Sequence, residues 1–266
     1  MARSSSGDSL LTRVMRVLQV FGGTPSATIS EIAVRADLPL ATAHRLVTEM
    51  LGFGLLERTE DRRIRMGVRL WEMSLRSHRV LGLQEAALPY MEDLQAVVRQ
   101  HVEIAVLTGT EVLYIERLSA PGAVANIAKI ARRLPVYACS SGLVLLAHAP
   151  SEVRDAVLTG PLETFTPQSI TDAARLRRVV GNVRRRGYAV APGLITVGSK
   201  GVAAPLRDAS GAVVAALSIV IPMTMDHRPV VPALMAAARG ISRAMGGATP
   251  GEADLVRQRN PLPISH

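Results

Sequence analysis

The sequence has a single cysteine, Cys139, and few aromatic residues, which make up 3% of its 266 positions. One cysteine excludes an internal disulfide and a zinc site built from cysteines, so a reducing compartment is the expected home. No uncharged apolar run reaches the roughly 18 residues that a transmembrane helix needs, and the first residues lack the apolar segment of a secretory signal. These absences favour a cytoplasmic protein with no membrane partner.

Basic residues, by contrast, are abundant. The chain has 31 lysines and arginines against 22 acidic residues, a formal net charge of +9. A basic protein can bind nucleic acid or an anionic surface, and composition alone does not distinguish the two. The 48% of hydrophobic residues and 20% of charged residues are typical of a globular protein, and the length is sufficient for two domains.

Two short helices are predicted near the start of the chain. Apolar residues at helical spacing indicate a first helix over residues 10–21. Thr28, followed three positions later by Glu31, forms a capping box, in which each side chain accepts a hydrogen bond from a free backbone amide. A second helix is therefore expected from Ile29 to about Ala36.

A third helix and a hairpin come next. The helix runs from about Pro39 to Gly52, because proline suits a first helical turn. Two strands, 55–58 and 63–66, then enclose a charged turn. Three helices and a hairpin within residues 8–67 indicate a winged helix-turn-helix.

The third helix has a polar face opposite its apolar stripe. The major groove of DNA admits one α-helix, and a guanidinium can bind guanine with two hydrogen bonds, so Arg45 is the strongest candidate for reading a base. Basic residues of the first helix and of the wing are placed to contact phosphates. The alternative is an ordinary solvated helix face, which the capped helix, turn and basic wing disfavour. The candidate DNA-binding residues are Arg13, Thr42, His44, Arg45, Thr48, Arg62, Arg63 and Arg65.

A linker helix is expected from Val68 to Leu83. Its pattern is apolar on more than one side, and such a helix must pack on something, most simply its copy in a second subunit. Pro89 is expected to begin another helix that reaches about Gln100.

Beyond His101, runs of β-branched residues alternate with turns and helical segments. A hairpin is expected around Gly109 and Thr110, and another strand within residues 124–138. Two short helices follow, and then a longer one with Thr171 as its N-cap and Gly187 as its stop. Three more strands, the last two joined at residues 208–211, and a closing helix complete the pattern. This order predicts an α+β domain with one antiparallel sheet.

Several segments, in this order, resemble the IclR family of bacterial transcriptional regulators. They are SEIA, LPLATAHRLVTEMLGFGLLER, RIRMG, LPVYACSSG, LTGPLETFTPQSIT, RRRGYAV and GVAAPLRDASGAVVAALSIVIP. The resemblance covers residues 8–245. It implies a winged helix-turn-helix, a linker helix and a C-terminal effector-binding domain similar to the GAF fold. It also implies homodimers, often paired into homotetramers, and control by small metabolites, commonly organic acids or aromatic compounds.

In the recognition helix, the resemblance places Thr42, His44 and Arg45 where the family usually has these residues. Leu40 and Ala41 stand where a lysine and a serine are common. Two polar contacts near the start of this helix are therefore absent, which affects the operator sequence rather than DNA binding itself.

The expected effector pocket departs further from the family pattern. In relatives that bind small keto acids, backbone amides matching those of Ser140 and Ser141 receive the carboxylate. Ala191, Gly201 and Val220 replace an aspartate, a cysteine and a serine of that pattern. The pocket is thus less polar than a keto-acid site, and we infer a larger or more apolar ligand, such as an aromatic acid. The candidate effector-binding residues are Ile127, Cys139, Ser140, Ser141, Ala191, Gly201 and Ser218.

We therefore expect a transcriptional regulator whose partners are a double-stranded DNA operator, a small-molecule effector and a second copy of itself. The expected parts are a disordered tip at 1–7, the DNA-binding domain at 8–67, the linker helix at 68–83, the effector-binding domain at 84–246 and a disordered tail at 247–266.

No cofactor and no metal are expected. Motifs for phosphate loops, dinucleotides and serine hydrolases are absent, and no histidines are paired four apart along a helix. Two other functions remain open: an enzyme carrying an accessory winged helix, and a module whose winged helix contacts protein.

Overall fold

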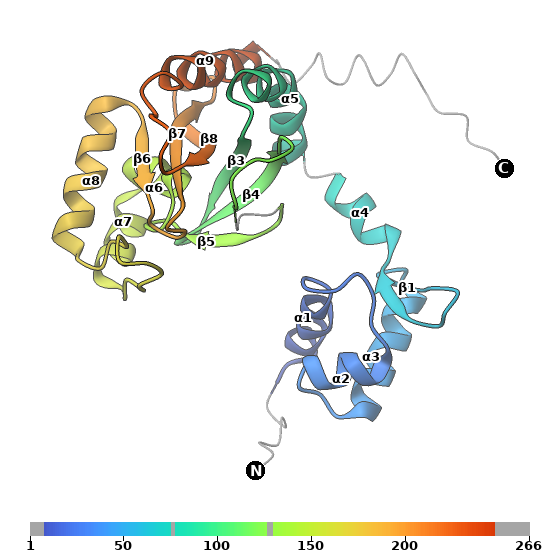
Figure 1. Ribbon diagram of the computed structural model, residues 1–266. Coiled ribbons are helices and arrows are strands. Elements are labelled where there is room, and N and C mark those ends of the chain that lie inside the picture. Colours follow the sequence, from blue (N-terminus) through green and yellow to red (C-terminus); the bar gives the residue numbers. More distant parts are fainter. Residues whose placement is uncertain (1–7, 76–77, 127–129, 248–266) are drawn as a thin grey trace. The chain divides into compact units, whose positions relative to one another are not determined.

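A computed structural model describes residues 8–75, 78–126 and 130–247 (Figure 1). The chain divides into two compact units, residues 1–79 and 80–266. The expected tip at 1–7 lies outside the described residues, as does the expected tail beyond Gly247. Among the helices described, none combines the length and the apolar character needed to cross a membrane.

The first unit contains three helices, a two-stranded sheet and a following helix. Its core is formed by fully buried residues such as Val17, Ile32, Leu46, Leu56 and Ile64, contributed by all three helices and both strands. The predicted winged arrangement is confirmed, with strand ends that differ by one residue from those expected. The elements are α1 (Leu10–Val20), α2 (Ile29–Arg35), α3 (Leu40–Gly52), β1 (Leu56–Arg58), β2 (Ile64–Met66) and α4 (Val68–Leu75).

The capping box at the start of α2 is present as predicted. The Glu31 amide donates to Thr28 Oγ1 at 3.2 Å, and the Thr28 amide donates to Glu31 Oε2 at 2.8 Å. This bond from the Thr28 amide, and then the nearby Arg63 guanidinium, hold the pKa of Glu31 below its usual range. Two amides that the helix cannot satisfy internally are thereby paired, which fixes where this seven-residue helix begins.

The second unit is built on a six-stranded sheet. All neighbouring strands are antiparallel, in the order β5-β4-β3-β8-β7-β6. This confirms the predicted α+β class with one antiparallel sheet. The elements are α5 (His78–Val98), β3 (His101–Thr108), β4 (Glu111–Leu118), β5 (Arg133–Pro135), α6 (Ser140–His148), α7 (Ser151–Thr159), α8 (Ala173–Arg186), β6 (Ala189–Pro192), β7 (Ser199–Arg207), β8 (Val213–Pro222) and α9 (Val231–Gly247).

Helices cover both faces of this sheet, so it separates two cores. Helices α5 and α9 pack on one face, and α6, α7 and α8 pack on the other (Figure 1). Successive strand residues point to opposite faces, as Ala203 and Ala204 show by joining different cores. The central strands are consequently buried on both sides, and a charged residue there is exceptional.

Helix α5 corrects one expectation. It continues without a break through Leu83, where the linker helix was to end, and through Pro89, where the next helix was to begin. The residues between α4 and α5 lie outside the described range. Leu83, Ala87, Met91 and Val98 form one buried stripe along α5. Burying this stripe outweighs the roughly 3 kcal/mol that an interior proline costs a helix.

The start of α8 corrects another expectation. Its N-cap is Asp172 rather than Thr171, and the carboxylate accepts hydrogen bonds from the amides of Ala174 at 3.2 Å and Arg175 at 2.8 Å. A carboxylate can pair with two amides at once and interacts favourably with the helix dipole. Gly187 ends α8 in the left-handed conformation, as predicted.

The expected strand within residues 124–138 also proved shorter. Only Arg133–Pro135 pairs with β4. Residues 127–129 lie outside the described range.

Candidate DNA-reading face and effector pocket

Helix α3 separates its apolar and polar residues cleanly. Ala43, Leu46, Val47 and Met50 are buried in the core of the first unit. The predicted DNA-binding residues of this helix lie outside the buried stripe: His44, Thr48 and the predicted base reader Arg45 are exposed, and Thr42 is half-buried. The face therefore has the shape that entry of a helix into the major groove requires.

Arg45 is the most available cation of this face. Its side chain is 62% exposed, and its Nη1 lies 3.8 Å from Glu49 Oε1, one helical turn further on. An exposed ion pair of this kind is worth only about 0.3–0.5 kcal/mol. The guanidinium can therefore leave Glu49 and bind a base edge with little loss of free energy.

The predicted wing arginines have different surroundings. Arg62 is exposed at the tip of the hairpin, where its φ is +62°. Arg65 donates through Nε to Glu57 Oε1 at 2.6 Å, directly across the two strands. Arg13, on α1, is half-buried, and its Nε has no hydrogen-bond partner among the described residues.

Arg63 has a structural role that the sequence did not indicate. Its Nη2 donates to Glu31 Oε2 at 2.7 Å, and its Nε donates to Ser26 Oγ at 3.0 Å. These bonds fasten the wing to the start of α2. Arg62 and Arg65 are consequently better placed than Arg63 to reach a phosphate.

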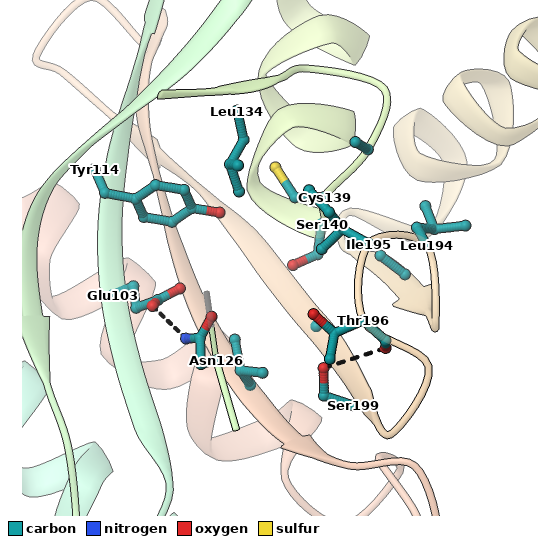
Figure 2. A pocket seen from close by; sticks show the side chains of 14 residues that line it. Glu103, Tyr114, Asn126, Leu134, Cys139, Ser140, Leu194, Ile195, Thr196 and Ser199 are labelled. Carbon is teal, nitrogen blue, oxygen red and sulfur yellow. Dashed lines mark hydrogen bonds between the residues drawn. The ribbon is translucent and has the colours of Figure 1, made fainter. Parts of the chain in front are cut away.

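A pocket in the second unit brings together residues from both halves of the sheet and from the start of α6 (Figure 2). Four of the predicted effector-binding residues line it: Cys139, Ser140, Ala191 and Gly201. Ile127, also predicted, lies outside the described residues. The volume within the pocket is about 40 Å³, which is room for a few water molecules.

Two glycines, one in α6 and one in the pocket wall, allow the start of α6 to approach its neighbours closely. A Cβ on Gly142, in the first turn of α6, would lie 2.2 Å from the carbonyl oxygen of Val136. A Cβ on Gly201 of β7 would lie 2.4 Å from Ser140 Oγ. Both distances are too short for a larger residue without a shift. Gly142 therefore lets the first turn of α6 lie against the backbone of Val136, and Gly201 lets Ser140 lie against β7.

Ser141 and Ser218, which the sequence also placed in the pocket, are not among the side chains that line it. Ser141 Oγ donates to Ser218 Oγ at 2.9 Å, and both residues are buried. A buried hydroxyl needs a partner, and these two provide one for each other, which ties α6 to β8.

Sequence reasoning missed several residues that line the pocket, and Glu103 is the charged one among them. It lies in the middle of β3 and is 1% exposed. Its Oε1 accepts a hydrogen bond from Asn126 Nδ2 at 2.6 Å and lies 3.8 Å from Arg117 Nε. Burial raises the pKa of Glu103 to about 7, although the Asn126 bond and Arg117 oppose this change. The signal was present in the sequence, because a lone acid interrupts a run of strand-forming apolar residues.

The loop that carries Asn126 is itself anchored. His101 Nε2 shares a hydrogen bond of 2.6 Å with the carbonyl oxygen of Val124, and the Val124 amide donates to Gln100 Oε1 at 3.0 Å. Burial lowers the pKa of His101, which favours the neutral ring. Asn126 is thereby held beside Glu103 by the backbone that precedes it.

Tyr114 and Cys139 form the wall next to Glu103. The Tyr114 side chain points into the pocket toward Cys139 (Figure 2). Burial raises the pKa of the Cys139 thiol to about 11, so it stays protonated and is not a nucleophile. Among the described residues, no group of three or more His, Cys, Asp or Glu side chains could hold a metal ion.

A winged helix-turn-helix with an exposed polar helix face in one unit, and a small pocket in the other, are typical of one class of protein. It is the helix-turn-helix transcriptional regulator with an effector-binding domain. Family models agree for both parts: "IclR helix-turn-helix domain" matches residues 10–60 and "Bacterial transcriptional regulator IclR C-terminal" matches residues 76–243. The chain belongs to the IclR family of bacterial transcriptional regulators, which are not enzymes.

Individual relatives support the same assignment. The chain is 28% identical to the HTH-type transcriptional regulator BhcR of Paracoccus denitrificans over 220 residues, 82% of this chain and 79% of that protein. It is 26% identical to the regulator KdgR of Escherichia coli over 244 residues, 90% and 93% of the two chains. Both are named as regulators, which removes the alternative of an enzyme with an accessory winged helix.

Solved structures include a more similar chain. An IclR homolog from Microbacterium hydrocarbonoxydans, crystallised in complex with 4-hydroxybenzoate, is 48% identical with a TM-score of 0.85. The match covers 89% of this chain and 99% of that one. A second IclR homolog, from Microbacterium sp. strain HM58-2, is 47% identical with a TM-score of 0.61 and covers 91% and 100%.

Proposed function

We propose that this regulator is controlled by an aromatic carboxylic acid that binds in the pocket at the start of α6. One observation carries the proposal: the first turn of a nine-residue helix contributes to the pocket, and the pocket wall lacks the aspartate, cysteine and serine that the family resemblance gives to a keto-acid site. Ala191, Gly201 and Val220 stand at those positions. Leu134, Leu194 and Ile195 add apolar surface.

The start of α6 provides for the carboxylate. No side chain caps this helix among the described residues, and its N-cap is Cys139. The first amides of a helix have no internal partner, and the helix dipole favours a negative charge there. The amides of Ser140 and Ser141 therefore suit the carboxylate, and the apolar wall suits the ring.

The present volume is too small for a benzene ring, so the ring must displace side chains or a loop of the wall. Residues 194–199 are the candidate segment, because they include most of the connection between β6 and β7 and the first residue of β7, and they contribute four lining residues. A ligand that binds one arrangement of this wall better than another shifts the protein toward it, which is the basis of control.

On DNA, we propose that α3 reads the major groove through Arg45, with Thr42, His44 and Thr48 beside it. Arg13, Arg62 and Arg65 contact the backbone, together with Arg63 to the extent that its bonds to Glu31 and Ser26 allow. These contacts predict an affinity that falls steeply with salt concentration.

We further propose that the active form is a cytoplasmic homodimer, or a pair of dimers. Helix α4 exposes Val68, Trp71 and Met73 at 55%, 61% and 57%. These exposed apolar side chains are most simply buried by packing against α4 of a second copy. Such a dimer would place two recognition helices on a roughly palindromic operator. Val68→Glu with Met73→Glu should halve the mass measured by light scattering. An unchanged mass would contradict an α4 interface.

The test of the effector uses the full chain and DNA from upstream of its own gene. A footprint identifies the operator, and 4-hydroxybenzoate is then titrated in gel shifts and in thermal melts. We expect the acid to change operator affinity and to raise the melting temperature, because it binds only the folded state. Gly201→Ala should weaken both effects, with Gly82→Ala, in open space on α5 and away from the pocket, as a matched control. A response to small keto acids alone would overturn the proposal.

A further inference from the structure

Glu103 is a buried acid with one oxygen that the protein leaves unused. Oε1 is occupied by Asn126 and lies near Arg117, whereas Oε2 is buried and has no hydrogen-bond partner among the described residues. An unpaired buried acceptor is costly, and native structures seldom contain one without a reason. Because this oxygen belongs to a lining residue, the reason is to be sought in the pocket.

The direction of the side chain fits this interpretation. Figure 2 shows the carboxyl group of Glu103 leaving β3 toward the interior of the pocket, with Ser140, at the start of α6, on the other side. A ligand whose carboxylate lies at α6 therefore presents its far end to Glu103.

We propose that Glu103 selects the effector by accepting a hydrogen bond, through Oε2, from a hydroxyl group on the ring opposite the carboxylate. The inference rests on the proposed function, since it assumes that an aromatic acid occupies this pocket. It goes further by assigning the specificity to a single residue. The preferred effector class is then the hydroxy-substituted aromatic acids, and unsubstituted rings bind poorly.

The chemistry around Glu103 favours a donor over other groups. A second carboxylate on the ligand would face a group that is at least partly ionised, and an apolar substituent would leave Oε2 unsatisfied. A hydroxyl donates one hydrogen bond, adds little volume and needs no counter-charge. Arg117, on β4, already lies close enough to balance part of the charge of Glu103.

The experiment is a cycle of two ligands and several proteins, measured by calorimetry on the full chain at pH 8. The ligands are 4-hydroxybenzoate and benzoate, which differ by one hydroxyl. We expect the unmodified protein to prefer 4-hydroxybenzoate by about tenfold or more, as for a hydrogen bond to a charged group. Glu103→Leu should reduce this preference to about one, and benzoate should bind that variant at least as well as it binds the unmodified protein.

Glu103→Gln is the second variant, in case the leucine does not fold. Its amide keeps an acceptor for Asn126 but can form only a weaker, neutral hydrogen bond with the hydroxyl, so the preference should fall several-fold. Glu152→Leu, on the exposed side of α7, is the control and should keep the full preference.

The outcomes separate the two proposals. Equal affinity of the unmodified protein for both acids, or a full preference in a folded Glu103 variant, overturns the role of Glu103 and leaves an aromatic effector in place. Failure of the unmodified protein to bind either acid overturns the proposed effector and this inference together.

Discussion

The recognition face of α3 and the pocket of the second unit use polar side chains in opposite ways. On α3, Arg45 stands in solvent with only a loose ion pair to Glu49. In the pocket, Glu103 is almost wholly removed from water and pairs through one oxygen. The exposed Arg45 has almost no effect on the stability of the fold, whereas the buried Glu103 lowers that stability at neutral pH.

Under the two proposals above, specificity for DNA and specificity for the effector have different consequences for stability. The polar side chains of a DNA-reading surface are hydrated when no DNA is bound, so substitutions among them have little effect on stability. A buried site is constrained by the packing around it. An unpaired polar group in such a site lowers the stability of the fold, and a hydrogen bond from a ligand can offset that loss. Substitutions in the two regions should therefore separate binding from stability in one case and couple them in the other.

The largest effect is expected from Gly142→Ala. The added methyl would lie 2.2 Å from the Val136 carbonyl oxygen, which is backbone and cannot turn away. We expect the second unit to lose about 3 kcal/mol or more of unfolding free energy. Urea denaturation followed by circular dichroism measures it. Gly198→Ala, with open space around it, is the control and should change little. Comparable stability of both variants would contradict the close approach at α6.

Glu103→Gln should come next, and its effect should depend on pH. The pKa of Glu103 is raised from 4.5 to about 7 in the folded state, so folding binds a proton. Below pH 4.5 both states are protonated and there is no cost. The cost grows as the unfolded chain ionises and is complete above pH 7. The variant should therefore be more stable than the unmodified protein by about 3 kcal/mol at pH 8 and about 1 kcal/mol at pH 5.

The groups around Glu103 do not change this sign. Arg117 and Asn126 favour the ionised form and are already included in the raised pKa. Tyr114 and Cys139, in the wall next to Glu103, have raised pKa values and stay neutral over this range. Urea titrations at the two pH values provide the test, with Glu152→Gln as a control for the loss of one carboxyl. A stability difference independent of pH would show that Glu103 is not protonated on folding.

Arg45→Ala should weaken operator binding by about 1–3 kcal/mol without lowering stability. Its side chain is exposed, so the fold loses only a weak ion pair. Gel shifts with operator and with unrelated DNA measure the specific part. Glu49→Ala, which releases the same ion pair, is the matched control and should not reduce affinity. Equal losses on both DNAs would reassign Arg45 to phosphate contact.

Thr28→Ala should have the smallest effect, a loss of about 1 kcal/mol from the first unit. The hydroxyl accepts the Glu31 amide and closes the capping box. Thr48→Ala is the comparison, because its hydroxyl donates to the His44 carbonyl within α3, so its removal should be neutral. Thermal melts measure both variants. A loss at Thr48 equal to that at Thr28 would remove the special role of the cap.

The first unit was predictable because its signals are local. The capping box, the apolar spacing of α3 and the short hairpin each lie within a few residues, and all three agree with the structure. The linker region was not predictable in the same way. From the local sequence, Pro89 predicts the start of a helix. The helix nevertheless continues through Pro89, because the apolar side of α5 packs on the sheet.

The pocket was only partly predictable. Cys139, Ser140, Ala191 and Gly201 were chosen by resemblance, and they do line it. Glu103, Tyr114 and Asn126 were missed because nothing in their own segments shows that they face Ser140. Ser141 and Ser218 were also chosen by resemblance, but their side chains do not line the pocket, because their hydroxyls pair with each other.

The sequence by itself determined the order of elements, the winged helix with its outward Arg45, and the family. These follow from patterns of hydrophobicity and capping that act over one or two turns. Only the tertiary structure decided that Glu103 of β3 lies across the pocket from the first turn of α6, with Oε2 unpaired among the described residues. Strands β3 and β7 meet through β8, and contacts across such a distance depend on how the whole sheet is ordered.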